Sequence, residues 1–287
     1  MERERIFMKK FHKKPSRFVE RVCLHVTDME RSLQFYQDIV GFKILSQKDR
    51  EVILTADGKT PLVILEEPDR VLPKEKRTTG LYHFALLLPS RTDLGSFLKH
   101  LLEKEYRLGA ADHQVSEAIY IDDPDGNGIE IYRDRPADEW KWSNEEVKMT
   151  TDPLDGEGLL AEAGDWNGLP ESTIMGHVHL HVKNLAETEA FYEKGLGFKV
   201  VTRYPGALFM STNDYHHHFG LNVWNGEGAP APKEDSAGLN WMTIVLEDEA
   251  ARDEVVKNLQ EMGASVEKNK EIVITADPSG NKIHLVV

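Results

Sequence analysis

The chain has 287 residues, of which 40% are hydrophobic, so it is long enough for two domains that each bury a core. Its formal net charge of -14 argues against nucleic-acid and anionic-membrane partners, because both would require a basic surface. No segment approaches the roughly 18 apolar residues of a membrane-spanning helix. The single cysteine, Cys23, fits a reducing cytoplasm and lies in an apolar pattern that predicts core packing. We therefore expect a cytoplasmic globular protein with a small-molecule partner.

Residues 1–18 are basic and contain no signal-peptide core, so we expect them to form a disordered tail. Beyond the tail the chain repeats at long period. The segment 26–43 recurs at 182–199, an offset of 156 residues (182 − 26), and the turn sequence Asp-Pro-x-Gly-Asn occurs at both 123–127 and 277–281. The repetition predicts four modules, near residues 19–72, 79–134, 174–226 and 238–287. They fall into two sequence domains, 19–134 and 174–287, joined by a linker, 135–173.

Each module begins with an apolar or alternating run that predicts a strand, followed by an amphipathic helix and then by further strands. In module one Leu33, Tyr36 and Val40 fall on one helical face, and Gly41 is expected to end the helix. The Asp-Pro-x-Gly-Asn turns precede the last strand of their modules. The pattern predicts an α+β protein of four βαβββ modules, with a short helix in the linker around residues 159–163.

The segment 113–130 combines His113, Tyr120, Pro124, Gly126 and Glu130 in one spacing. It resembles the signature of extradiol catechol dioxygenases at every position except one, where Ala111 stands two residues before the histidine. Together with the four modules, it resembles the vicinal oxygen chelate (glyoxalase/bleomycin resistance/dioxygenase) superfamily. That resemblance implies that two modules pair to form a cupped mixed sheet, with a metal in the cup.

In that superfamily the metal ligands come from the first strand of each paired module and from the last strand of one or both. These positions fall on His83 and Glu130 in module two and on His177 in module three. The corresponding positions in modules one and four are Arg21, Trp241 and His284. The resemblance therefore implies that module two pairs with module three, within one chain or across a dimer. The alternative is sequential pairing, which would leave the ligand set incomplete.

Two neutral imidazoles and one carboxylate form the facial arrangement of non-haem Fe(II) oxygenases, with Mn(II) as an alternative metal. His177, His179 and His181 alternate along one strand, so all three point to one face, and such a strand could also carry them without a metal. His179 is an alternative to His177. His181 is expected to be structural, because His25 occupies its place in module one.

The segment from Asn213 to His217 resembles the Asn-x-x-His-His segment of extradiol dioxygenases, in which the second histidine is the acid/base group. That role falls on His217, although His216 or His218, on the opposite face of a predicted strand, could replace it. The alternative interpretation is a surface histidine cluster. Tyr120 is expected to hydrogen-bond a substrate oxygen, with a core aromatic as the alternative, and His113 to steady the same site.

The resemblance implies an extradiol dioxygenase that converts catechol and O2 to 2-hydroxymuconic semialdehyde, with His217 taking and returning a proton. Electrons would come from the substrate, and the chain has no dinucleotide fingerprint or phosphate loop. The alternatives are a glyoxalase- or epimerase-like metal enzyme, favoured by a second carboxylate on the later strands of module three, and a metal-free binding protein. The sequence leaves open which catechol or hydroquinone is used and whether exposed sheet edges form a homo-oligomer.

Overall fold

The computed structural model describes residues 10–269 and 271–287, and two mixed β-sheets dominate this part of the chain. Each has eight strands, in the orders β16-β17-β18-β15-β1-β4-β3-β2 and β12-β13-β14-β11-β5-β8-β7-β6. The first sheet is built from modules one and four, and the second sheet from modules two and three. The predicted α+β class is confirmed.

The strands of the first sheet are β1 (Phe18–His25), β2 (Lys43–Lys48), β3 (Glu51–Thr55), β4 (Val63–Glu66), β15 (Gly238–Val245), β16 (Val266–Asn269), β17 (Ile272–Ala276) and β18 (Lys282–Val286). The strands of the second sheet are β5 (Gly80–Leu87), β6 (Gly109–Asp112), β7 (Ser116–Asp122), β8 (Gly128–Asp134), β11 (Ile174–His181), β12 (Lys199–Tyr204), β13 (Ala207–Ser211) and β14 (Phe219–Asn222). Each module thus has the predicted order of one strand, one helix and three strands.

The module helices are α2 (Met29–Phe35), α3 (Arg91–Glu103), α5 (Leu185–Ala190) and α6 (Glu249–Glu261), and α2 and α5 continue into the π-helical turns η1 (Tyr36–Val40) and η3 (Phe191–Gly195). Each begins after a polar cap whose side chain accepts a hydrogen bond from a backbone N–H in the first turn; the caps are Asp28, Ser90, Asn184 and Asp248. Gly41 ends the first helix with a left-handed φ of 90°, as predicted. Within the described ranges, no helix is long and apolar enough to cross a membrane.

Modules two and three are joined within one chain by antiparallel pairing of β5 with β11, and modules one and four by pairing of β1 with β15. The predicted pairing of module two with module three is therefore confirmed, and sequential pairing does not occur. Both sheets cross the division of the sequence into 19–134 and 174–287, so that division stays a prediction.

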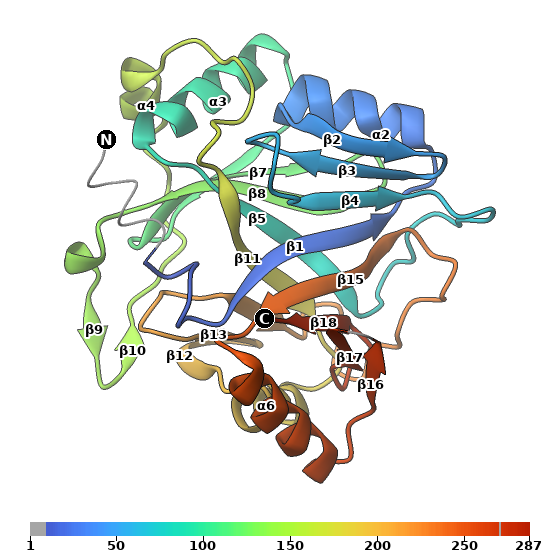
Figure 1. Ribbon diagram of the computed structural model, residues 1–287. Helices are drawn as coiled ribbons and strands as arrows, with labels where there is room; N and C mark the ends of the chain where they lie inside the picture. Colours follow the sequence, from blue (N-terminus) through green and yellow to red (C-terminus); the bar gives the residue numbers. More distant parts are fainter. Residues whose placement is uncertain (1–9, 270) are drawn as a thin grey trace.

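The two sheets share one hydrophobic core. Val22 and Leu24 of β1 belong to the same buried cluster as Val178 and Leu180 of β11, and Figure 1 shows β1 and β15 lying across β5 and β11. Because successive side chains of a strand point to opposite faces, the residues between these core positions point away from the other sheet. The outward face of the second sheet carries the predicted ligands.

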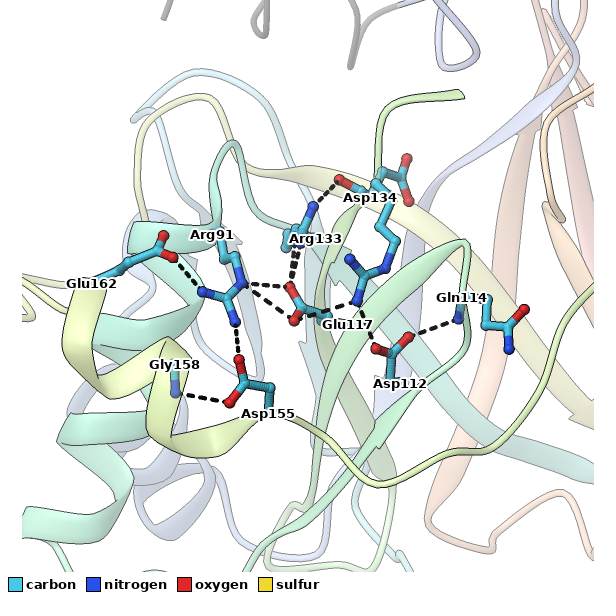
Figure 2. A network of polar contacts seen from close by, with 10 residues as sticks. Arg91, Asp112, Gln114, Glu117, Arg133, Asp134, Asp155, Gly158 and Glu162 are labelled. Carbon is cyan, nitrogen blue, oxygen red and sulfur yellow. Dashed lines mark hydrogen bonds and ion pairs between the residues drawn. The ribbon is translucent and has the colours of Figure 1, made fainter. Parts of the chain in front are cut away.

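The linker between the halves is ordered and docks on module two. It contains η2 (Ala137–Glu139), β9 (Trp142–Ser143), β10 (Glu146–Val147) and the predicted short helix, α4 (Gly156–Glu162). Arg91 of α3 contacts Asp155 and Glu162 at the two ends of α4, and its Nε lies 3.0 Å from the carboxylate of Glu117 (Figure 2). Glu117 on β7 is buried, and Arg133 also pairs with it. These charge-assisted bonds fix the linker against the second sheet.

The amino-terminal segment differs from the predicted disordered tail. Residues 1–9 lie outside the described residues, but residues 10–17 form ordered turns and Phe18 begins β1. Phe11 is buried against Trp140 and Tyr215, with ring centroids 5.6 and 5.0 Å away. The prediction of disorder was therefore wrong for residues 10–18, because basic composition concealed an aromatic side chain that fills a gap between the linker and module three.

Candidate metal centre and active site

Three adjacent strands of the second sheet carry the three predicted ligands, His83 on β5, Glu130 on β8 and His177 on β11. The strand register brings them together, because Ala85 pairs with Glu130 in the parallel ladder and with His177 in the antiparallel ladder. His83 lies two residues before Ala85 on the same strand, so its side chain points to the same face of the sheet as those of Glu130 and His177.

One potential ligand atom from each of these side chains lies within 4.8 Å of the others. Oε2 of Glu130 is 3.0 Å from Nε2 of His83 and 3.1 Å from Nε2 of His177. All three residues are buried. Among the residues that the structure describes, no second group of three or more His, Cys, Asp or Glu donors is close enough to hold a metal.

A β-bulge at Gly176 directs His177 to this face. The register of β11 against β5 shifts between Met175 and His177, so Met175 packs in the shared core while His177 points outward. A Cβ at Gly176 would clash with the hydroxyl of Tyr132, and only glycine fits there without movement. The carbonyl of Gly176 accepts a hydrogen bond of 2.8 Å from Nε2 of His12 in the amino-terminal segment.

Burial sets the protonation states of the ligands. It lowers the pKa of His177 to about 4, so the imidazole is neutral at pH 7. Burial alone would raise the pKa of Glu130, but the neighbouring His177 and His83 outweigh it and hold that pKa well below its usual value. At neutral pH a buried carboxylate therefore lies beside a neutral imidazole, an arrangement that is costly without a counter-charge. A bound cation would supply that charge.

The donor set fits a metal on a second ground. Nδ1 of His177 is buried and has no hydrogen-bond partner among the described residues, and the buried Nε2 of His83 has the Glu130 carboxylate as its polar neighbour there. Two imidazole nitrogens and one carboxylate oxygen are also the ligand set of the 2-His-1-carboxylate metal sites, which leave coordination positions open for substrate. The residues present therefore fit a catalytic metal.

Tyr120 and His113 form a hydrogen-bonded pair beside this group. Tyr120 lies directly opposite Glu130 in the antiparallel ladder of β7 and β8, as predicted. Nδ1 of His113 is 2.6 Å from the carbonyl oxygen of Thr150, and its Nε2 is 2.6 Å from the Tyr120 hydroxyl. Because the carbonyl only accepts, Nδ1 carries the proton of a neutral His113, and Nε2 accepts from Tyr120.

The Tyr120 hydroxyl is held in its protonated form. Burial, followed by the charge of Glu130, raises the pKa of Tyr120 well above its usual value. Its hydroxyl proton points to His113, which leaves the oxygen lone pairs for a donor inside the cavity. The side chain is therefore placed to exchange a hydrogen bond with a bound hydroxyl group.

The sequence predicts that the three consecutive histidines lie on a strand. In the structure they do not. They occupy the connection between β13 and β14, where Asn213 and Asp214 turn the chain with φ values of 55° and 57°. The side-chain alternation of a strand therefore does not apply to them. The prediction was wrong because the sequence does not show where the backbone hydrogen bonds of β13 end and those of β14 begin.

Of these histidines, His217 is the one that faces the site. Its ring centroid is 4.1 Å from that of His177, and it borders the cavity described below. His218 points elsewhere, with Nε2 3.0 Å from the backbone oxygen of Phe11. His216 is fully buried and touches His217. All three are buried in the fold, so they are not a surface cluster.

A cavity of about 270 Å³ opens over these side chains. His83, His113, Tyr120, Glu130 and His217 border it. Its wall also contains the aromatic side chains of Tyr82, Tyr204, Phe209 and Trp224, and neither Lys nor Arg is among the described residues that line it. The cavity can hold a flat, uncharged ring with its polar edge toward the metal ligands.

The other histidines of β11 have protein partners. Nε2 of His179 accepts a 2.9 Å hydrogen bond from the side-chain amide of Asn222, and Nδ1 of His181 is 2.7 Å from Oδ1 of the same residue. His179 borders the cavity but is not in the three-ligand group, so the geometry favours His177 over this alternative.

Within the described residues, the first sheet has no corresponding group of three potential ligands. On the outward face of this sheet, the equivalent positions are occupied by Arg21, Trp241 and His284, and the Trp241 and His284 rings stack with centroids 4.3 Å apart.

Sequence reasoning missed two features of the candidate site, one on the second sheet and one in the linker. Asp134, on the same face of β8 as Glu130, could have been found from the two-residue strand period. Cavity residues in the linker, such as Met149, carry no local signal.

Comparison with known proteins agrees with this architecture. The family model of the Glyoxalase/Bleomycin resistance protein/Dioxygenase superfamily matches residues 19–131 and 174–285. A catechol-2,3-dioxygenase of Bacillus subtilis (strain 168) is 48% identical over 271 residues, which cover 92% of this chain and 95% of that protein. Biphenyl-2,3-diol 1,2-dioxygenase 3 of Rhodococcus globerulus is 30% identical over 160 residues, covering 53% of this chain and 83% of that protein.

A similar fold occurs in a solved structure of glyoxalase I from Zea mays. It superimposes with a TM-score of 0.59 at 18% sequence identity, and the alignment covers 94% of this chain and 92% of that chain. This likeness concerns the fold alone. Because the family model matches both halves, and because the Bacillus subtilis relative aligns along nearly the whole sequence, the chain belongs to the glyoxalase/bleomycin resistance protein/dioxygenase superfamily.

Proposed function

We propose that the protein is an extradiol ring-cleaving dioxygenase that converts a catechol and O2 to a 2-hydroxymuconic semialdehyde. The observation that carries the proposal is that His83 and Glu130 converge with His177 and also border, with Tyr120 and His217, one cavity. The Bacillus subtilis relative, named a catechol-2,3-dioxygenase, supports the same activity. The glyoxalase-like alternative is disfavoured because strands β12, β13 and β14 carry no Asp or Glu.

We propose iron(II) as the metal, held by the two imidazoles and the Glu130 carboxylate. When bound, iron would act as a Lewis acid toward the catechol oxygens and conduct electrons from the ring to O2. Manganese(II) would accept the same donors, so metal content has to be measured. A substrate without charged substituents is favoured, because the described lining of the cavity offers no cation to pair with a carboxylate.

The remaining residues would manage protons and orientation. His217 takes a proton from one catechol hydroxyl and returns it when the ring opens. The oxygen of Tyr120 accepts a hydrogen bond from the substrate while its own proton stays on the His113 side. Phe209 and Trp224 confine the ring and exclude water from the reacting edge.

The test is anaerobic loading of the purified protein with Fe(II), followed by O2 uptake with catechol, 4-methylcatechol and 3,4-dihydroxybenzoate. We expect oxygen consumption and a yellow ring-opened product with the two uncharged catechols. A His177→Ala variant should lose the activity. Activity that survives in this variant would contradict the proposed metal site. Tight iron binding without oxygen uptake on any catechol would favour a glyoxalase-like enzyme.

A further inference from the structure

A chain of two hydrogen bonds, one part-buried and one buried, leads from Asp134 to the proposed acid/base residue. Oδ1 of Asp134, the last residue of β8, is 2.8 Å from Nε2 of His216. Nδ1 of His216 is in turn 2.8 Å from Nδ1 of His217. His216 is fully buried, and the side chain of Asp134 is 10% exposed. The order is carboxylate, imidazole, imidazole, cavity.

We propose that Asp134 and His216 are positioning residues that fix the tautomer and the ring orientation of His217. This inference rests on the proposed function, in which His217 takes the proton of a catechol hydroxyl. This relay, the hydrogen-bonded series of Asp134, His216 and His217, decides which ring nitrogen of His217 presents a lone pair to the cavity.

The tautomers follow from the donor and acceptor types along the chain. A carboxylate only accepts hydrogen bonds, so Nε2 of a neutral His216 carries the proton that points to Asp134. Nδ1 of His216 then has a lone pair and accepts, which requires a proton on Nδ1 of His217. A neutral His217 therefore has its lone pair on Nε2, the nitrogen that is not used by the relay. That is the form a general base needs.

Packing holds the relay in one arrangement. The His216 ring lies 4.1 Å from the ring of Tyr215 and 5.1 Å from that of Trp140, measured between centroids. The Tyr215 hydroxyl donates to Oδ1 of Asp134 at 3.3 Å, and it lies 2.7 Å from the hydroxyl of Tyr132. The carboxylate therefore has a second partner that limits its rotation.

The relay would also stabilise the protonated state. When Nε2 of His217 receives the proton of the catechol hydroxyl, the new positive charge can be shared with His216, whose other nitrogen bonds the Asp134 carboxylate. The same proton leaves from Nε2 when it is returned to the ring-opening product, so the relay ends each cycle unchanged.

The first experiment measures the histidine tautomers directly and does not require catalytic activity. In metal-free protein with ¹⁵N-labelled histidine, long-range ¹H–¹⁵N correlation spectra should show His217 protonated on Nδ1 and His216 on Nε2. An Asp134→Asn variant can offer its amide N–H to His216, which would reverse both tautomers. Finding His217 protonated on Nε2 in the unaltered protein would overturn the inference, and that result does not depend on any variant folding.

The second readout is kinetic, with the iron-loaded enzyme and catechol. Asp134→Asn should lower kcat about 100-fold, the scale of one general acid-base contribution, with KM and iron content within about twofold. Asp277→Asn is the matched control, because this buried carboxylate, between β17 and β18, accepts hydrogen bonds from Tyr192 and Asn281 outside the relay. An unchanged kcat in Asp134→Asn would overturn the positioning role. An unaltered enzyme that consumes no O2 would instead contradict the proposed function, while the spectra still decide the tautomers.

Discussion

Glu130 is the residue on which the site depends, because it is a fully buried carboxylate with two histidine nitrogens within 3.1 Å of one oxygen. Its neighbour His177 is neutral at pH 7. Burial of an ion is costly unless a counter-charge is present, so this group of side chains is stable only as part of a larger charged unit. A bound metal would complete that unit and supply its chemistry.

Loss of the Glu130 carboxylate should abolish metal retention. We expect Glu130→Ala to weaken iron binding more than about 100-fold, beyond the cost of losing a residue that only supports a ligand. The matched control is His284→Ala, which changes the corresponding position of the first sheet and should leave iron binding intact. Metal analysis after dialysis measures both. Equal iron content in the two variants would show that the metal is held elsewhere.

The Tyr120 hydroxyl should contribute to catalysis without holding the metal. Tyr120→Phe removes one hydrogen bond to the substrate, so kcat/KM for catechol should fall about tenfold, corresponding to about 1.4 kcal/mol. Iron content should stay at the level of the unaltered enzyme. If kcat/KM is unchanged, Tyr120 serves as a packing residue only, which was the alternative interpretation of the sequence.

At the scale of elements, strand register and one bulge create the site. Ala85 has Glu130 and His177 as its partners on either side, and the bulge at Gly176 turns His177 out of the core. The amino-terminal segment supports this arrangement from outside the sheet. His12 donates to the Gly176 carbonyl, and the Phe11 backbone oxygen bonds His218 in the connection that carries His217.

Truncation of Phe11 should therefore affect both stability and turnover. We expect Phe11→Ala to lower the free energy of unfolding by about 3 kcal/mol, the usual cost of removing a buried aromatic ring. Urea denaturation of the metal-free protein measures the change, with Leu102→Ala, an exposed position on α3, as the control. A change below about 0.5 kcal/mol would mean that the segment does not dock in solution. Turnover should fall as well, because the His217 connection loses its support.

At the scale of the whole molecule, each sheet combines one module from the first half of the sequence with one module from the second half. His83 and Glu130 come from the first half and His177 from the second, so the metal would link segments that are far apart in the chain. The first sheet keeps the same architecture without the ligands and packs against the second sheet through the shared core. The second sheet carries the candidate site, and the first sheet packs behind it.

Metal removal should lower stability, because the complete ligand set exists only in the folded chain. At a free metal concentration of about 100 times Kd, binding should add about 2.7 kcal/mol to the free energy of unfolding. Calorimetry with and without a chelator should show a higher Tm for the iron-loaded form. The His177→Ala variant is the control and should show no such shift. An equal response of the two proteins would indicate binding at another site.

The sequence by itself determined the four βαβββ modules, because hydrophobic period, helix caps and turn residues act locally and repeat along the chain. Through a family resemblance it also predicted which residues would be the metal ligands, and the structure brings these residues together. Only the tertiary structure decided that β5 pairs with β11 in one chain and that His217 lies in a connection instead of a strand. It also decided that Phe11 is buried and that Asp134 reaches His216. These features depend on contacts between distant segments, and local patterns do not encode the packing that selects them.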